Sequence, residues 1–114
     1  LLREAAPAVD FAGSLRQLIA SLLPHGKPRI GTVAEVANLS IRTLQRRLTT
    51  ENRSYSGLLE EARLQAALRL LRQKETKLVD VAFELGYSDA ANFTRAFRRW
   101  SGVPPRTARR QNAG

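Results

Sequence analysis

Basic and amide side chains recur at helical spacing in the stretch 41–50. A helix there has an apolar inward side: Ile41, Leu44 and Leu48. Its outward side is polar and basic: Arg42, Gln45, Arg46 and Thr49. An arginine can donate two hydrogen bonds to guanine O6 and N7, and a glutamine amide can bond adenine N6 and N7. This stretch therefore suits the reading of base edges in a nucleic-acid groove, which is binding chemistry.

A second stretch, 89–100, repeats this arrangement. Its inward positions are aromatic: Phe93, Phe97 and Trp100. Its outward positions are small, polar or basic: Ala91, Thr94, Arg95 and Arg98. When the two stretches are superposed, Gln45 falls on Thr94, Arg46 on Arg95 and Thr49 on Arg98. The chain thus contains two versions of one unit.

The segments before these helices repeat as well. Val33-Ala34 falls on Val81-Ala82, and Ser40 falls on Ser88. The residues between them, Asn38 and Gly86, both tolerate a positive φ, which the sharp bend of a helix-turn-helix requires. Each unit is therefore predicted to be a helix, a tight turn and an outer helix, with Ser40 as the N-cap of the first outer helix.

Four further segments must position these units. A first helix is expected over 10–23, and Thr32 with Glu35 forms a capping-box pattern that predicts a helix start at Thr32. A long helix is expected over 54–73, about 30 Å in length. Its inward side is apolar: Leu58, Leu59, Ala62, Ala66, Leu70 and Leu71. Pro104-Pro105 then opens a last short helix. The long helix compares well with the 34 to 36 Å, roughly, between successive major-groove faces of a duplex, so one chain could read two adjacent turns at an asymmetric site.

Composition favours a nucleic-acid partner. The 114 residues hold 19 Lys plus Arg against 10 Asp plus Glu, a formal charge of +9, which attracts polyanions. There is no Cys and one His, so neither a disulfide framework nor a Cys/His zinc site is expected, and no cofactor or metal is predicted. No apolar run approaches a membrane span and no signal-peptide pattern opens the chain, so we expect a soluble, intracellular protein. Alternating β-branched runs are absent, which predicts an all-α fold.

Three other interpretations are weaker. An enzyme is not expected, because there is no Cys, no usable His constellation, no Gly-rich phosphate loop and no close carboxylate pair besides the solvated Glu60-Glu61 step. The aromatic residues Tyr87, Phe93, Phe97 and Trp100 could stack single-stranded bases, but their spacing opposite the arginines indicates core. A helical protein-interaction module with a basic face is the remaining alternative. Arg63 is expected to be structural, bonded to carbonyls or an acid.

These motifs resemble the DNA-binding domain of the AraC/XylS family of transcription regulators over about residues 32–109. The residues that carry the resemblance are Leu39-Ser40, Leu44, Arg46, Leu48, Arg63-Leu64, Ala67, Leu70-Leu71, Gly86-Tyr87-Ser88, Phe93, Arg95, Phe97, Gly102 and Pro105. The resemblance implies a seven-helix domain, with two homeodomain-like helix-turn-helix subdomains joined by the long helix. It also implies binding to promoter double-stranded DNA in the bacterial cytoplasm, at the nucleoid, and activation or sometimes repression through RNA polymerase.

Site residues follow from the resemblance by position. Base reading falls on Arg42, Gln45 and Arg46 in the first unit and on Ala91, Asn92, Thr94 and Arg95 in the second. Phosphate contact is expected for the flanking hydroxyls and arginines: Ser40, Thr49, Ser88, Arg98, Arg99 and Arg106.

The expected organisation is a linker remnant over 1–9 and a DNA-binding domain over 10–114. Within the domain, we expect unit one over about 10–53, the linker helix over about 54–73 and unit two over about 76–110. The isolated domain is expected to be monomeric, and the intact protein to dimerise through a missing N-terminal domain. Two positions depart from the family pattern. Ala91 replaces a longer polar side chain, so the second unit is expected to read fewer bases. Ala108 replaces an aromatic, so the tail after Pro105 is expected to be loosely held.

Overall fold

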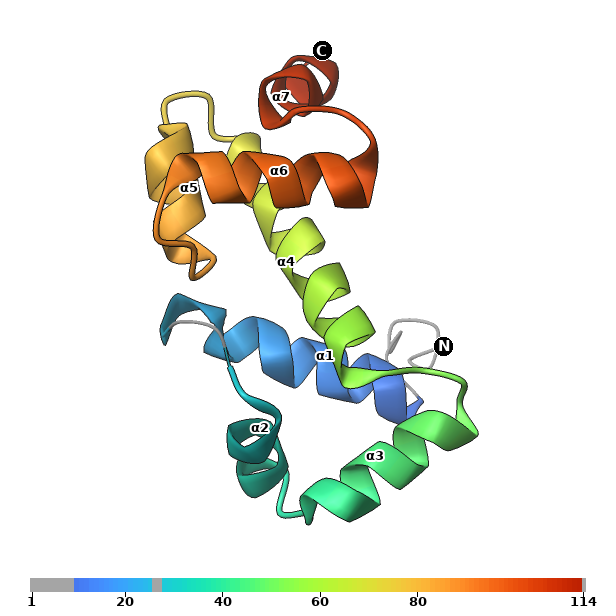
Figure 1. Cartoon of the computed structure of the whole chain (residues 1–114). Coiled ribbons are helices and arrows are strands. Elements are labelled where there is room, and N and C mark those ends of the chain that lie inside the picture. Colours follow the sequence, from blue (N-terminus) through green and yellow to red (C-terminus); the bar gives the residue numbers. More distant parts are fainter. Residues whose placement is uncertain (1–9, 26–27, 114) are drawn as a thin grey trace, which may run out of the picture. The chain divides into compact units, whose positions relative to one another are not determined.

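The computed structural model describes residues 10–25 and 28–113, and within them every regular element is helical. The elements, in chain order, are α1 (Phe11–Leu22), the 3₁₀ turn η2 (Leu23–His25), α2 (Ile30–Val36), α3 (Ile41–Thr50), α4 (Tyr55–Leu71), α5 (Leu78–Glu84), α6 (Ala90–Ser101) and α7 (Pro105–Ala113) (Figure 1). The all-α prediction with seven α-helices is confirmed. The predicted linker remnant over 1–9 lies outside the described residues.

The chain divides into two compact units. Among the described residues, unit 1 contains 10–22 and 28–62, and unit 2 contains 23–25 and 63–113. The division falls inside α4, so this helix contributes its first half to unit 1 and its second half to unit 2. At 17 residues, α4 is about 25 Å long, shorter than the sequence suggested.

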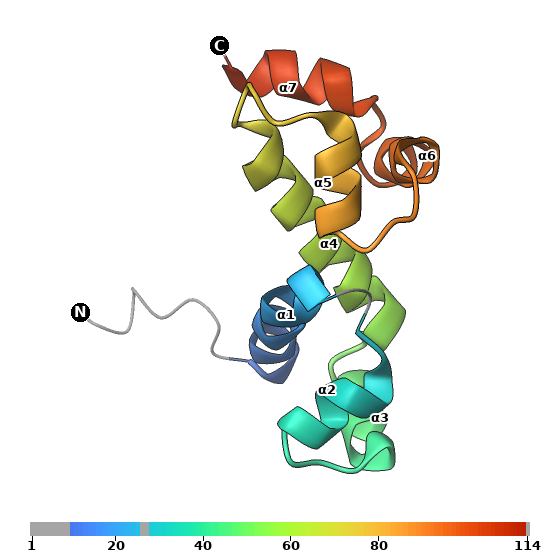
Figure 2. The same ribbon diagram turned by 90° about the vertical axis from the view of Figure 1, so that its left-hand side faces the viewer.

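Unit 1 contains the first helix-turn-helix, α2 and α3, joined by a tight turn (Figure 2). Asn38 in that turn has φ 61°, the positive value that the sequence predicted. Ser40 caps α3, since its hydroxyl oxygen accepts a hydrogen bond from the Thr43 N–H at 3.0 Å. The core is aliphatic: Ala12, Leu15, Ile19, Val33, Ala34, Leu44, Leu48, Leu58, Leu59 and Ala62.

Two predictions for unit 1 are wrong. Helix α2 begins at Ile30, two residues before Thr32, and its N-cap Arg29 makes no side-chain cap. The Thr32/Glu35 pattern therefore lies inside the helix, whose first backbone bond runs from the Val33 N–H to the Arg29 carbonyl at 3.1 Å. Ile41, expected in the core, is 43% exposed, since it is the first residue of α3 and lies beyond the packed interface.

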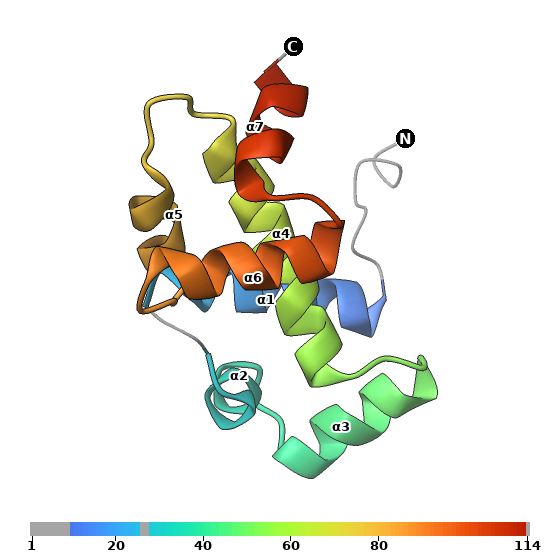
Figure 3. The same cartoon turned by 45° about the horizontal axis from the view of Figure 1, so that its top comes forward.

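Unit 2 contains the second helix-turn-helix, α5 and α6, followed by α7 (Figure 3). Gly86 in its turn has φ 89°, again the predicted positive value. The core here is partly aromatic: Ala66, Ala67, Leu71, Val81, Ala82, Leu85, Phe93, Ala96, Phe97 and Ala108. Phe93 and Phe97 are fully buried with ring centroids 5.8 Å apart, which excludes them from stacking on bases.

The tail after Pro105 is held in place, contrary to the expectation from Ala108. Residues 105–113 form α7, and Ala108 is buried. Arg109 donates to three backbone carbonyls, those of Leu71 at 2.9 Å, Gln73 at 3.2 Å and Thr76 at 2.7 Å. The Arg109 side chain thus bonds carbonyls at and beyond the end of α4 that have no helical partner. These hydrogen bonds hold α7 in place although position 108 has an alanine instead of an aromatic residue.

None of the helices in residues 10–25 and 28–113 combines the length and the apolar character needed to cross a membrane.

Candidate nucleic-acid interface

The outer helices α3 and α6 share a charge pattern. Each contains three arginines and no acidic residue: Arg42, Arg46 and Arg47 on α3, and Arg95, Arg98 and Arg99 on α6. All six side chains are exposed. Each helix therefore adds an exposed cationic surface to its unit.

The base-reading residues predicted on α3 lie together on this exposed side. Arg42, Gln45 and Arg46 are exposed, whereas Leu44 and Leu48 are 0% and 1% exposed. The three side chains occupy positions i, i+3 and i+4, which are neighbours on one helix face. They can thus approach one stretch of a groove at the same time.

The two hydroxyls predicted to contact phosphate on α3 already have partners. Ser40 donates to the Thr43 hydroxyl at 3.0 Å, and Thr49 donates to the Gln45 carbonyl at 2.9 Å. A phosphate oxygen only accepts hydrogen bonds, so either hydroxyl must turn its proton away from this partner to contact one. Their role as phosphate ligands remains a prediction.

The residues predicted on α6 differ in exposure. Ala91, Asn92 and Arg95 are exposed, but Thr94 is partly buried. Thr94 lines a cavity of about 290 Å³ together with Arg106 and the Pro104-Pro105 corner. The structure therefore brings Thr94 and Arg106, which are separated in sequence, to one place beside α6.

A chain of polar contacts organises the start of α6. The Asp89 carboxylate caps the helix by accepting from the Asn92 N–H at 2.7 Å, and it also accepts from the Asn92 side-chain amide at 3.3 Å. The side-chain amide oxygen of Asn92 in turn accepts a hydrogen bond from the Arg95 guanidinium. Asn92 therefore orients Arg95, a function that the sequence did not suggest.

The same contacts adjust the alignment of the repeat. Ser88 was matched with Ser40, but the N-cap of α6 is the next residue, Asp89. Ser40 and Ser88 are 48 positions apart, whereas Arg46 and Arg95 are 49 apart, so the second unit has one extra residue, and the caps show that it precedes the outer helix. Ser88 is exposed in the turn, and Arg98 and Arg99 are exposed on α6, where they can approach a phosphate.

The sequence did not indicate several contacts that support the two helix-turn-helix motifs. Arg63 is 7% exposed and donates to the Tyr87 hydroxyl at 3.1 Å, with its guanidinium carbon 4.4 Å from the centre of the Tyr87 ring. Its structural role was predicted, but its partner is a tyrosine instead of a carbonyl or an acid. Glu51, just after α3, accepts from the N–H groups of Phe11 and Ala12 at 3.3 and 3.0 Å. No periodic signal identifies such partners, which lie 24 to 40 residues apart.

Two helix-turn-helix motifs with cationic outer helices, in an all-α chain, define a DNA-binding protein of the tandem helix-turn-helix class. The helix-turn-helix domain family matches residues 33–111. This chain belongs to the AraC/XylS family of transcription regulators, which are DNA-binding proteins and not enzymes.

Individual relatives agree with this assignment. The transcriptional activator RhaS of Escherichia coli is 35% identical over 108 residues, covering 92% of this chain and 39% of RhaS. A DNA-binding transcriptional dual regulator from Escherichia coli K-12 has a similar structure, with a TM-score of 0.85 and 27% identity over 95% of this chain and 96% of that one. The DNA-binding domain of AdpA, solved with a target DNA, has a TM-score of 0.68 and 27% identity over 85% and 90% of the two chains. The chain spans less than half the length of the curated relatives it matches.

Proposed function

We propose that this domain binds a specific promoter duplex through α3 and α6, each inserted in a major groove. The observation that carries the proposal is the repeated charge pattern, in which both outer helices combine a buried apolar side with three exposed arginines and no acid. In a helix-turn-helix the outer helix enters the major groove and its polar side chains contact base edges. The AdpA domain, similar in fold, was crystallised with a target DNA.

Sequence reading is assigned to the exposed positions of the two helices. In unit 1, Arg42 and Arg46 suit guanine and Gln45 suits adenine. In unit 2, the base-reading positions are Ala91, Asn92, Thr94 and Arg95. Arg95 suits guanine, and Asn92 also orients Arg95. The remaining polar groups hold the backbone: Ser40, Thr49, Ser88, Arg98, Arg99 and Arg106.

The two outer helices, α3 and α6, differ in sequence and belong to one chain. We propose that they engage successive major grooves, so that the operator consists of two unlike half-sites. A palindromic operator is expected when a symmetric dimer presents two copies of one recognition helix, and the proposed binding mode does not require such a dimer. The presence of two helix-turn-helix motifs with unlike outer helices on one chain supports this proposal.

Regulation requires a partner beyond DNA. We propose that the domain activates transcription through contact with RNA polymerase in the bacterial cytoplasm, as the similarity to the activator RhaS suggests. A monomeric domain within a longer protein that dimerises elsewhere fits the larger size of the relatives.

A second candidate, a protein-interaction module, is favoured by one observation. Phe83 and Val79, four residues apart on α5, are 57% and 38% exposed, and large exposed apolar side chains are common at protein contacts. This surface lies on α5 and the arginines lie on α6, so the two candidate functions use different helices.

Salt and sequence dependence separate DNA reading from protein docking. A domain that neutralises six to eight phosphates, roughly, should lose affinity with a slope of about −5 to −7 in log K against log salt. Fluorescence anisotropy on a target promoter and on a scrambled duplex measures both quantities. We expect the steep slope together with a preference for the promoter of about a thousandfold or more. Equal affinity for both duplexes at every salt concentration would contradict the proposal.

A further inference from the structure

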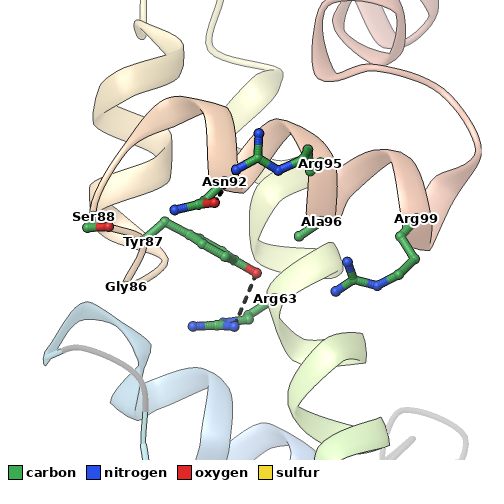
Figure 4. A pocket seen from close by; sticks show the side chains of 8 residues that line it. All are labelled: Arg63, Gly86, Tyr87, Ser88, Asn92, Arg95, Ala96 and Arg99. Carbon is green, nitrogen blue, oxygen red and sulfur yellow. Dashed lines mark hydrogen bonds between the residues drawn. The ribbon is translucent and has the colours of Figure 1, made fainter.

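A cavity of about 490 Å³ lies in unit 2 beside the start of α6. Its lining comes from α4, the α5–α6 turn and α6: Arg63, Gly86, Tyr87, Ser88, Asn92, Arg95, Ala96 and Arg99 (Figure 4). Its volume falls within the range of ligand sites, roughly 300 to 1,000 Å³. Three of the eight lining residues are arginines and none is acidic, so the cavity has a positive potential.

Arg63 forms the inner wall of this cavity. Its guanidinium lies against the Tyr87 ring and donates to the Tyr87 hydroxyl, but its buried Nε has no hydrogen-bond partner in the structure (Figure 4). A buried charged donor without a partner is costly, because it has lost water and gained nothing in exchange. The Nε itself is closed to solvent, so an anion in the cavity would meet the part of the Arg63 guanidinium that lines the cavity and would supply a countercharge there.

The other two arginines take different directions. Arg99 extends from α6 toward α4, on the side of α6 where Arg63 lies (Figure 4). Arg95 instead lies along α6 toward Asn92, to which it donates (Figure 4). Arg63 and Arg99 therefore form the anion-attracting pair, and Arg95 lines the opposite edge, where the base-reading face begins.

We propose that this cavity binds a phosphate group through Arg63 and Arg99, with Ser88 at its edge. A tetrahedral oxyanion offers several acceptors to guanidinium donors from two directions, which a planar carboxylate meets less well. Two sources present this group: a backbone phosphate of bound DNA, or free phosphate and phosphorylated small molecules. The DNA source rests on the proposed function, while the free source does not.

The first experiment uses inorganic phosphate and the chain without DNA. Arginine Nε–H signals are followed by ¹H–¹⁵N NMR during a phosphate titration, with chloride replaced to hold ionic strength constant. The Arg63 Nε signal should shift in a saturable way. Trp100, the single tryptophan, has its ring centroid 6.3 Å from that of Tyr87 and provides a second readout by fluorescence.

Matched variants locate the site. Arg99→Gln removes one charge from the lining and should weaken phosphate binding about tenfold. Arg69→Gln removes one charge from an exposed position of α4 in the same unit, outside the lining, and should leave phosphate binding unchanged. Arg63→Lys keeps the charge but not the planar guanidinium. It should weaken binding as well, with thermal unfolding recorded to show that it folds.

The second experiment repeats the comparison with duplex DNA. If a backbone phosphate occupies the cavity, Arg99→Gln should reduce the salt slope by about 0.9 relative to Arg69→Gln, without changing which promoter is preferred. A saturable phosphate shift without this change in slope identifies a free phosphate as the ligand, and the shift together with the change in slope identifies the DNA backbone. The change in slope without the shift shows only the Arg99 backbone contact of the proposed function and contradicts the cavity site. If Arg99→Gln and Arg69→Gln behave alike in both experiments, the cavity is not a phosphate site, even where promoter binding itself is intact.

Discussion

The two outer helices share a backbone design but are organised at opposite ends. Helix α3 is held against α1 near its C-terminus. Glu51, which follows α3, accepts hydrogen bonds from the first N–H groups of α1, and the guanidinium carbon of Arg47 lies 4.1 Å from the centre of the Phe11 ring. Helix α6 is organised at its N-terminus, through the chain from Asp89 to Asn92 to Arg95.

The polar contacts of the two outer helices therefore have different roles. In unit 1 they hold the helix against its neighbour. In unit 2 they orient the side chain expected to read a base before any duplex is present. Orientation in advance reduces the rotamer entropy lost on binding, so Arg95 is expected to gain more from each hydrogen bond than an unsupported arginine.

The cores of the two units also differ, and truncation should show this as the largest effect. Phe97→Ala removes a fully buried ring from beneath α6 and should lower the free energy of unfolding by about 3–5 kcal/mol. Leu48→Ala, on the buried side of α3, should lower the free energy of unfolding by about 2–5 kcal/mol. We expect the smaller loss for Leu48→Ala, because removing a leucine side chain leaves a smaller cavity than removing a phenylalanine ring. Urea unfolding followed by circular dichroism measures both. A cost below about 1 kcal/mol for Phe97→Ala would show that the aromatic core does not support α6.

The loss of base discrimination in variants should show whether the Asn92–Arg95 contact matters for reading the operator. Arg46→Ala and Arg95→Ala should each lose about 1–3 kcal/mol of discrimination, in different halves of the operator. Asn92→Ala should affect the same half as Arg95→Ala, and the double variant should lose less than the sum by about 0.5 kcal/mol or more. The pair Arg46/Arg95 is the control and should be additive. Competition binding with single-base operator variants supplies these values, and additivity of the Asn92/Arg95 pair would refute the orienting role.

The two N-caps provide the smallest comparison. Ser40→Ala and Asp89→Ala should each lower the free energy of unfolding by about 1 kcal/mol, because each leaves one helix N–H without its acceptor. Asp89→Asn keeps an oxygen at the cap and should stay within about 0.5 kcal/mol of the parent chain. Thermal unfolding at constant salt tests this. A loss for Asp89→Asn as large as for Asp89→Ala would mean that charge, not the cap bond, stabilises α6.

Local patterns predicted most of the elements. The bounds of α3, the positive φ of Asn38 and Gly86 and the opposed faces of both outer helices follow from periodicity and turn chemistry, which act over a few residues. The start of α2 was missed because its N-cap, Arg29, makes no side-chain cap and so leaves no capping pattern in the sequence.

The supporting contacts of the site could not be predicted in the same way. Arg109 lies in the tail that was expected to be loosely held, yet its acceptors lie 33 to 38 residues earlier in the chain. Such pairs depend on tertiary packing, and a single sequence does not indicate which distant carbonyl or ring an arginine meets. The base-reading assignments themselves stay predictions until DNA binding is measured.

Selection of bound sequences from a random duplex pool tests the central claim most directly. With the isolated domain at physiological salt, we expect one asymmetric motif of two unlike halves about one helical turn apart, with Arg46→Ala weakening the sequence preference in one half and Arg95→Ala in the other. Recovery of a palindrome, of a single half-site, or of no motif would contradict two different readers acting from one chain.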